Sequence, residues 1–107
     1  MNCSILIEDT EQNIQEFQKA NCNKPPVPVA YFTEPINVWD ILGSCSFHIT
    51  PNNQISCDIK FREAESGRLA FTLIEHGCTV KAVFHYKASS NQIVDLVFLD
   101  FFDRTAE

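Results

Sequence analysis

Apolar and polar side chains alternate across the second half of the chain, and this feature limits the fold more than any other. Alternation of this kind is typical of antiparallel strands with one buried face. It covers residues 44–50, 54–62, 69–73 and 80–86. Short segments with turn-forming residues separate these stretches. The pattern therefore predicts four consecutive antiparallel strands that form a meander.

Opposed residues of a hairpin lie on the same face of a sheet, so the register can be checked from the sequence. The first hairpin would place Phe47 opposite Cys57, and the third would place Phe71 opposite Ala82. The intervening hairpin, with its turn at Gly67, agrees with both. All three hairpins direct their apolar positions to one face, and we expect this face to be the inner one.

The last stretch, residues 93–102, is apolar on both faces (IVDLVFLDFF). A strand of this kind must be covered on both sides. The helices expected from the first half would cover the inner face, whereas the outer face of the neighbouring strands is only mildly polar. We therefore expect a homodimer that packs through the sheet. The alternative is that residues 1–7 fold over the same surface. The expected interface residues are Ile74, Val83, Phe98, Leu99, Phe101 and Phe102.

The first half of the chain predicts an N-terminal helix. Residues 4–21 carry Ile14 and Phe17 at helical spacing, with Thr10 or Asp9 as the candidate cap. The segment Ile5-Leu6-Ile7 is also compatible with a short strand, and the sequence does not decide between the two.

Prolines then divide the chain. The run N-K-P-P-V-P at 23–28 ends the helix, and residues 27–33 are expected to form a short edge strand. Residues 33–35 (TEP) have the composition of a helix start. We interpret 36–42 as a short helix that ends at Gly43, in preference to a strand.

These elements predict one α+β domain over residues 1–107, with an N-terminal helix and a short second helix on a curved antiparallel meander of five to six strands. The order of elements resembles the cone-shaped fold of the nuclear-transport-factor-like and ketosteroid-isomerase-like superfamily, and the helix-on-sheet arrangement is similar to that of cystatin-like domains. The resemblance rests on element order and on no motif. It implies a pocket between the helices and the sheet, and dimerisation through the sheet.

Charge and composition exclude several classes of protein. The net charge of −6 argues against a basic nucleic-acid-binding protein. No apolar run has the length of a membrane span, and the N-terminus lacks the basic start of a secretory signal, so we expect a cytoplasmic protein without membrane contact. The five cysteines lack metal-binding or redox spacing and are interpreted as reduced thiols. Cys45 and Cys57 would lie near each other across the first hairpin, where a disulfide is the alternative.

Candidate catalytic residues are few. Asp95 and Asp100 lie in the strongly apolar last strand, where burial would raise the pKa of a carboxyl group and suit it to acid–base chemistry. A four-residue loop before the strand would direct Asp95 inward beside Phe84, and a five-residue loop would direct Asp100 inward. No histidine has a carboxylate at ligand spacing, so His48, His76 and His85 are interpreted as surface residues. No metal or cofactor is expected.

Three functions are compatible with these features. The first is a homodimeric binding protein that takes a small apolar ligand or a partner protein, and we favour it because no catalytic motif is present. The second is a small isomerase-like or hydrolase-like enzyme that uses Asp95 or Asp100. The third is an acidic inhibitor or immunity-type protein for a basic partner. The expected pocket residues, which core packing would also explain, are Tyr31, Trp39, Phe47, Phe71, Phe84 and Tyr86.

Overall fold

The computed structural model describes residues 1–32 and 41–102. Within these residues the chain forms two helices and six strands. In chain order they are β1 (Asn2–Ile7), α1 (Glu11–Asn21), β2 (Val27–Tyr31), β3 (Ile41–Ile49), β4 (Ile55–Phe61), α2 (Glu65–Glu75), β5 (Thr79–Tyr86) and β6 (Val94–Phe102). The α+β class predicted from the sequence is confirmed.

The six strands form one mixed sheet in the order β1-β4-β3-β2-β6-β5. All neighbouring pairs are antiparallel except β2 and β6, which run parallel. The expectation of a purely antiparallel meander is therefore wrong. The expectation that residues 27–33 form an edge strand is also wrong, because β2 lies between β3 and β6.

Pro28 is the residue that suggested an edge position for β2, and its place in the sheet shows how an interior strand can contain a proline. Proline cannot donate a backbone hydrogen bond, and it is therefore rare in the middle of a sheet. Pro28 lies opposite Ser44 of β3, but the parallel pairing with β6 begins only at Val29, which faces Val97. The proline thus occupies the part of β2 that is paired on one side, and the strand enters the sheet interior one residue later.

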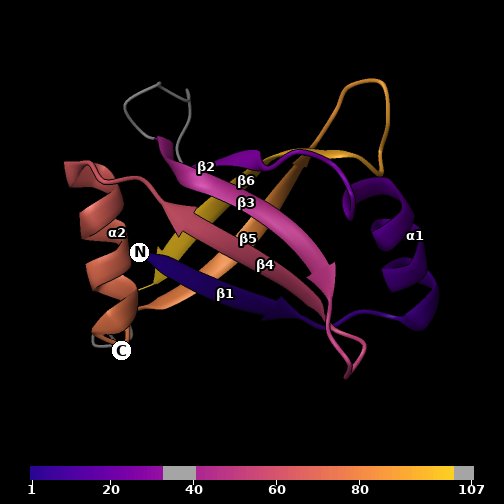
Figure 1. Cartoon of the computed structure of the whole chain (residues 1–107), viewed down its shortest axis with the longest axis horizontal. Helices are drawn as coiled ribbons and strands as arrows, with labels where there is room; N and C mark the ends of the chain where they lie inside the picture. Colours follow the sequence, from indigo (N-terminus) through magenta and orange to yellow (C-terminus); the bar gives the residue numbers. More distant parts are fainter. Residues whose placement is uncertain (33–40, 103–107) are drawn as a thin grey trace.

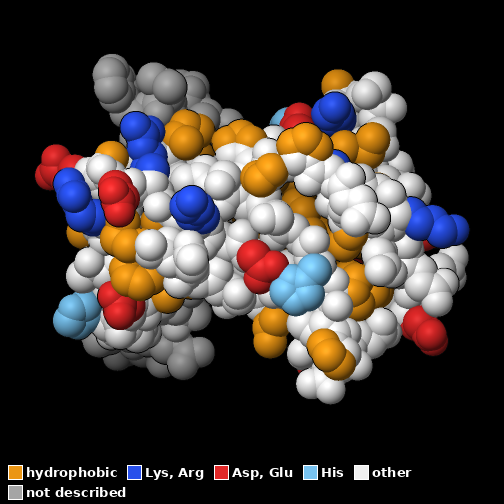
Figure 2. Space-filling view, in the orientation of Figure 1, with side chains coloured by type: hydrophobic (Ala, Val, Ile, Leu, Met, Phe, Trp, Pro, Cys, Tyr) orange, Lys and Arg blue, Asp and Glu red, His pale blue; other side chains and the backbone are white. Residues whose placement is uncertain are grey.

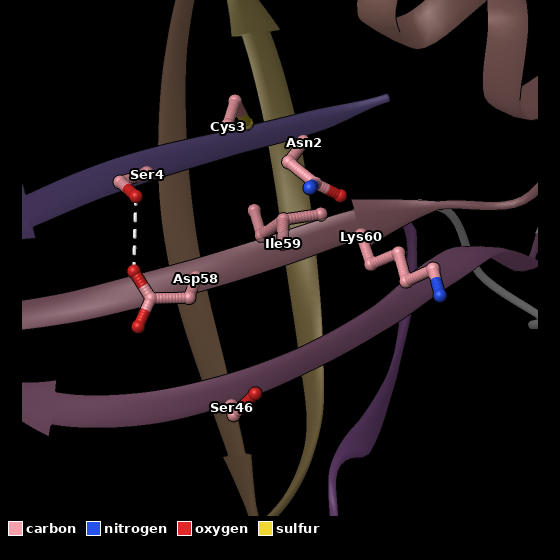
Figure 3. A pocket seen from close by; sticks show the side chains of 7 residues that line it. All are labelled: Asn2, Cys3, Ser4, Ser46, Asp58, Ile59 and Lys60. Carbon is pink, nitrogen blue, oxygen red and sulfur yellow. Dashed lines mark hydrogen bonds between the residues drawn. The ribbon is translucent and has the colours of Figure 1, made fainter.

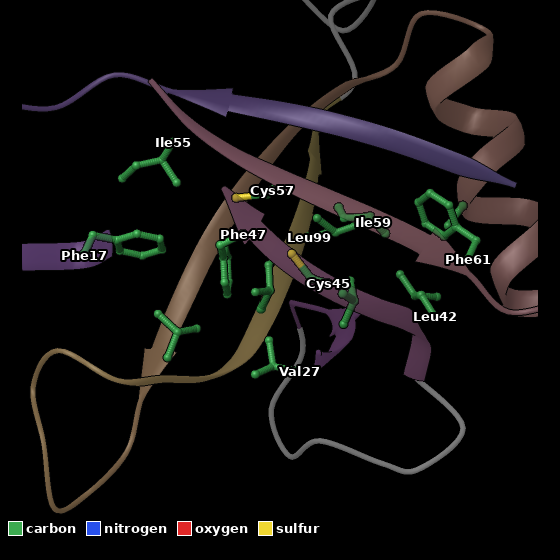
Figure 4. Packing of buried hydrophobic residues seen from close by; sticks show 14 of the residues in the cluster. Phe17, Val27, Leu42, Cys45, Phe47, Ile55, Cys57, Ile59, Phe61 and Leu99 are labelled. Atoms are coloured by element: carbon green, nitrogen blue, oxygen red, sulfur yellow. The ribbon is translucent and has the colours of Figure 1, made fainter. Parts of the chain in front are cut away.

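The sheet curls over itself into a half-barrel (Figure 1). In this view β1, β4 and β3 form a front layer, and β6 and β5 cross behind it. Helices α1 and α2 lie at opposite ends of the curled sheet. The buried side chains fill the space between the two layers, with Phe17 of α1 at one end and Phe61 near α2 at the other (Figure 4).

The predicted N-terminal helix is two elements. Its first part is strand β1, in which inward-facing half-buried residues alternate with exposed ones and which pairs with β4. Helix α1 begins after Thr10, whose Oγ1 accepts a hydrogen bond from the Asn13 amide at 3.2 Å. The strand alternative for 5–7 and the Thr10 cap are confirmed, and residues 2–7 form an edge of the sheet instead of covering its outer face.

Residues 69–73 belong to α2, and the strand predicted there is wrong. The buried residues of this helix are Gly67 and Ala70, and Phe71 and Ile74 pack against the core. These positions follow helical spacing, whereas the alternating position Leu69 is exposed. The segment satisfies both periodicities, and packing against the end of the half-barrel selects the helical one. The predicted registers through residues 69–73 are consequently wrong as well.

Strand β3 includes Gly43, so this glycine does not terminate a helix. A Cβ atom at this position would lie 2.1 Å from the carbonyl oxygen of Lys60 in β4. Glycine is required because the two backbones approach too closely for a side chain. Residues 33–40, which hold most of the predicted helix and Trp39, lie outside the described residues.

The β3–β4 hairpin has the register predicted from the sequence. Phe47 lies opposite Cys57, and Ile49 lies opposite Ile55. In the β5–β6 hairpin, Phe84 faces Val97, and the register shifts between His85 and Tyr86. This irregularity is a β-bulge, and it decides which side of the sheet carries each aspartate of β6.

Candidate functional site

A cavity of about 360 Å³ lies between α1 and the inner face of β5. Strands β1 and β5 are the two edges of the sheet, so the half-barrel is open between them. Ile7 at the end of β1 and Ala82 of β5 both line the cavity. The cavity therefore lies at the opening between the two edge strands, which would pair with each other in a closed barrel.

The floor of the cavity is aromatic. Phe17 of α1 stacks on Phe84 of β5 with ring centroids 5.4 Å apart, and Tyr86 meets Phe84 edge to face at 6.5 Å. Phe47 lies behind them, 5.1 Å from Phe17 and 5.6 Å from Phe84. Tyr86 is 41% exposed. The aromatic floor (Phe17, Phe84 and Tyr86) thus extends the core to the solvent at this end of the molecule.

The rim of the cavity is polar and acidic. It consists of Asp9, Asn13, Glu16, Asn91 and Gln92. Asp9 Oδ1 accepts hydrogen bonds from the Thr10 amide at 2.7 Å and from Asn13 Nδ2 at 2.9 Å. Both hydrogen bonds lower the pKa of Asp9, and the bond from Asn13 has the larger effect. The carboxylate is therefore charged at neutral pH.

Asn21 holds the two sides of the rim together. Its side chain is buried, its Nδ2 donates to the carbonyls of Phe17 and Gln92 at 3.2 and 2.9 Å, and its Oδ1 accepts from the Val94 amide at 2.9 Å. These bonds fix the start of β6 against the end of α1. Sequence reasoning missed Asn21, although an asparagine one turn after Phe17 continues the buried face of the helix.

A second hollow of about 410 Å³ lies on the outer face of β1, β4 and β3 (Figure 3). Its central polar residue is Asp58, which accepts hydrogen bonds at Oδ1 from Ser4 and Ser56, both at 2.9 Å. His48 Nδ1 lies 2.5 Å from Asp58 Oδ2. In the space-filling view, an acidic side chain and a histidine touch in the middle of this largely uncharged face (Figure 2).

The hydrogen bonds of Asp58 determine its charge. Burial by itself would raise the pKa of this carboxyl group, but the bonds from His48, Ser56 and Ser4 outweigh burial and lower it. Both serine hydroxyls donate to the carboxylate and not to the imidazole. A serine nucleophile needs a hydrogen bond to its general base, so this group of residues lacks the geometry of a Ser–His–Asp triad.

The His48–Asp58 contact escaped the sequence analysis, although the correct register of this hairpin contains it. His48 faces Ser56, and Ser46 faces Asp58, so His48 and Asp58 are diagonal neighbours on the outer face. Although His48 and Asp58 are ten residues apart along the chain, they belong to neighbouring pairs on the same face of the hairpin.

Asp95 and Asp100 are both directed away from the cavity. Asp95 Oδ1 lies 2.6 Å from His85 Nδ1, and both side chains are exposed to solvent to a third or more. Asp100 faces Lys81 across the β5–β6 pair, next to the outward pair Val83 and Phe98. Tyr86 pairs with Val94 and the Lys87 amide donates to the Ile93 carbonyl, so the turn has the register of the five-residue loop. The prediction that this loop would direct Asp100 inward is wrong, because the bulge shifts the register and leaves both aspartates on the outer face.

The residues expected in a pocket are distributed over the whole core. Phe84 and Tyr86 line the cavity, and Phe47 is buried behind its floor. Phe71 contacts Phe61 at the α2 end, with centroids 5.8 Å apart, and Tyr31 contacts Phe101 at 5.6 Å. The remaining residue, Trp39, lies outside the described residues.

The residues expected at a dimer interface fall on both faces of the sheet, except Ile74, which lies in helix α2 and not on the outer face of a strand as expected. Val83 and Phe98 point outward, and Phe32, which is 52% exposed, packs against Phe98 with centroids 5.4 Å apart. Leu99 is buried, and Phe101 and Ile74 pack against the core. Phe98 and Leu99 thus occupy opposite faces, as expected, and the side chain of Phe102 lies outside the described part of the chain.

The five cysteines are free thiols. Cys45 and Cys57 are both buried. The pKa of the Cys45 thiol is raised, mainly by a hydrogen bond with the Cys57 side chain and secondly by burial. Among residues 1–32 and 41–102, no cluster of three or more histidine, cysteine, aspartate or glutamate side chains has a metal-binding arrangement. No helix within the same ranges has the length and apolar character of a membrane span.

Comparisons of the chain with family models, with curated proteins and with solved structures find no match.

Proposed function

We propose that this protein binds a small, largely apolar ligand in the cavity between α1 and β5. The observation that carries the proposal is the aromatic floor, where Phe17, Phe84 and Tyr86 form a connected apolar surface that reaches solvent. Small-molecule sites are typically concave, apolar cavities with a few polar groups at their edge, and their volumes begin at about 300 Å³. The cavity has a volume in this range, and it has an aromatic floor with polar groups at its rim.

The hydrogen-bond network around Asn21 supports a pre-formed site. It joins the end of α1 to Gln92 and Val94, and so it fixes the distance between the two sides of the rim. A site that is ordered before binding loses less conformational entropy when the ligand enters. Binding is favoured over catalysis because Asp95 and Asp100, the carboxylates considered for acid–base chemistry, lie on the opposite face of the sheet.

Filling the cavity tests this function. Ala82→Phe would place a ring in the space above the floor, because Ala82 lines the cavity from β5. The matched control is Val83→Phe, which adds the same ring on the outer face of the same strand. The measurement is a titration with the neutral probe 2-phenylethanol, followed by amide chemical shifts in NMR spectra.

The expected result is saturable binding with the largest shifts in α1 and at residues 82–92. Ala82→Phe should abolish these shifts and Val83→Phe should retain them, with both variants folded by circular dichroism. Shifts of equal size in all three proteins would refute the cavity as the site. If Ala82→Phe does not fold, Ala82→Leu provides a smaller filling group for the same comparison.

We also propose a homodimer that packs through the outer face of β5 and β6. The proposal is supported by the exposed ring of Phe32 and the half-buried Val83 on this face, and by Phe98, which points outward and is covered in part by Phe32. Exposed apolar side chains that are grouped on one face mark interaction surfaces more often than scattered ones. A cytoplasmic location is proposed on the basis of the five free thiols, since reduced cysteines are typical of that compartment.

A further inference from the structure

We infer that the ligand of the α1–β5 cavity is a small organic cation, an ammonium group carried on an aromatic or short alkyl body. This inference rests on the proposed function and specifies its ligand class. It follows from three properties of the cavity: the sign of its charged groups, the position of its aromatic rings and the anchoring of one carboxylate.

The charged residues that line the cavity are both acidic. They are Asp9, at the start of α1, and Glu16, two turns further along, and no lysine, arginine or histidine is among the described lining residues. Lys24, at the other end of α1, donates through its ammonium to the carbonyl of Val94. The charged groups that act on Lys24 are Lys87, which repels it, and Asp95, which attracts it from the outer face. Neither Asp9 nor Glu16 forms an ion pair within residues 1–32 and 41–102, so the charged groups that line the cavity are negative.

The rings lie where a cation would meet them. Tyr86 belongs to the aromatic floor and is 41% exposed, so its ring reaches solvent in the same cavity that Asp9 and Glu16 line. An ammonium group is attracted both by a carboxylate and by the face of an aromatic ring, and partial removal from water strengthens both attractions. The apolar body of such a ligand would cover Phe84 and Phe17, while its charge would remain at the rim.

Asp9 is held in position before any ligand binds. The Thr10 amide and Asn13 Nδ2 both donate to its Oδ1, which leaves Oδ2 without a partner among the residues that the structure describes. A carboxylate fixed by two hydrogen bonds loses little side-chain entropy on binding a cation. Glu16 supplies a second negative charge on the same side of the cavity.

The experiment compares three probes with the same aromatic body and different charges: phenethylammonium, 2-phenylethanol and phenylacetate. Isothermal titration calorimetry of the full chain at about pH 7.5, where all three keep their charge states, gives the three dissociation constants. We expect the cation to bind about tenfold more tightly than the alcohol, and the anion to bind more weakly than both. The preference for the cation should decrease as the salt concentration rises.

Two variants locate the charge responsible. Glu16→Gln removes one rim charge without changing the shape of the side chain, and it should weaken phenethylammonium binding by about two- to fivefold while leaving 2-phenylethanol unchanged. Glu75→Gln, at the end of α2, changes the net charge equally, but Glu75 does not line the cavity. It should leave all three dissociation constants unchanged, because its charge lies at the opposite end of the half-barrel.

The outcomes separate this inference from the proposed function. Equal affinity for the cation and the alcohol, or a preference for the anion, would overturn the cationic ligand class and leave the cavity as an apolar binding site. Failure of all three probes to bind at millimolar concentration would refute both. An equal loss of cation binding in Glu16→Gln and Glu75→Gln would assign the preference to net charge and would also overturn the inference.

Discussion

The backbone amide of Val94 in β6 donates a hydrogen bond of 2.9 Å to the buried Oδ1 of Asn21 in α1. These residues are 73 positions apart, and their contact joins the first helix to the last strand. The same asparagine donates to the carbonyl of Gln92, at the rim of the cavity. One buried polar side chain therefore determines how α1 lies against the β5–β6 hairpin.

Replacement of Asn21 should be costly. Asn21→Ala removes three hydrogen bonds and leaves the Val94 amide without its partner, so the free energy of unfolding should fall by about 2–3 kcal/mol. Urea denaturation measures the change. Gln15→Ala, at an exposed position of the same helix, should change the stability by less than about 0.5 kcal/mol. Similar losses in the two variants would contradict the importance of the Asn21 network.

The stability contribution of Asp58 should depend on pH. Its pKa is lowered in the folded state, so the ionised form favours folding above the unfolded pKa of about 3.9, and the contribution disappears as pH falls through the lower folded value. The Asp58 side chain is 37% exposed, so water screens its interactions and we expect Asp58→Asn to cost about 1 kcal/mol at pH 7.

Chemical denaturation at about pH 7 and about pH 2.5 measures this difference. The stabilities of the wild-type chain and Asp58→Asn should differ at the higher pH and converge at the lower one. Glu63→Gln, an exposed substitution with the same change in charge, is the control. A difference that stays constant between the two pH values would show that the hydrogen bonds to Asp58 do not depend on its ionisation.

Two glycines should respond differently to alanine. Gly43→Ala would force the new methyl group against the Lys60 carbonyl, 2.1 Å away, and should destabilise the fold by about 3 kcal/mol. Gly77 has a φ of +85° but nothing within 4 Å of a Cβ atom, so Gly77→Ala should cost about 1 kcal/mol through backbone strain alone. Thermal and urea denaturation give the order, and the reverse order would contradict the close approach of β3 and β4.

The proposed dimer predicts a specific effect of charge on the outer face. Val83→Glu should dissociate the dimer into folded monomers, because a buried carboxylate without a partner is strongly disfavoured in an apolar interface. Light scattering over a range of protein concentrations measures the mass, and circular dichroism verifies the fold. Thr72→Glu, at an exposed position of α2, should remain dimeric. A monomeric wild-type chain at every concentration would refute the dimer.

The spacing of apolar residues predicted the secondary structure correctly where it fitted only one kind of element. The β3–β4 hairpin was predicted with its register, since alternation and a short turn leave few other ways to bury Phe47 and Cys57 together. The prediction for residues 69–73 was wrong because two periodicities fit this segment. Leu69, Phe71 and Leu73 alternate as in a strand, whereas Ala70 and Ile74 follow the spacing of a helix. A short segment with both periodicities is decided by its surroundings and not by its own residues.

The candidate site could be predicted in part. Alternation places Phe84 and Tyr86, two of the residues named for a pocket, on the inner face of β5, where both line the cavity beside α1. Neither the acidic rim nor Asn21 was expected, since α1 meets the β5–β6 hairpin through residues about 70 positions apart. The His48–Asp58 contact was within reach of the predicted register, which already placed the two residues diagonally on one face.

The sequence by itself determined the α+β class, the first helix with its Thr10 cap, and the apolar face of the β3–β4 hairpin. Each depends on residues close together along the chain, where periodicity and capping act directly. Tertiary structure alone decided the parallel pairing of β2 with β6, the bulge that leaves Asp100 as well as Asp95 on the outer face, and the cavity beside Phe84. Those features arise when a curled sheet brings distant segments together, and no local pattern encodes which distant segments will meet.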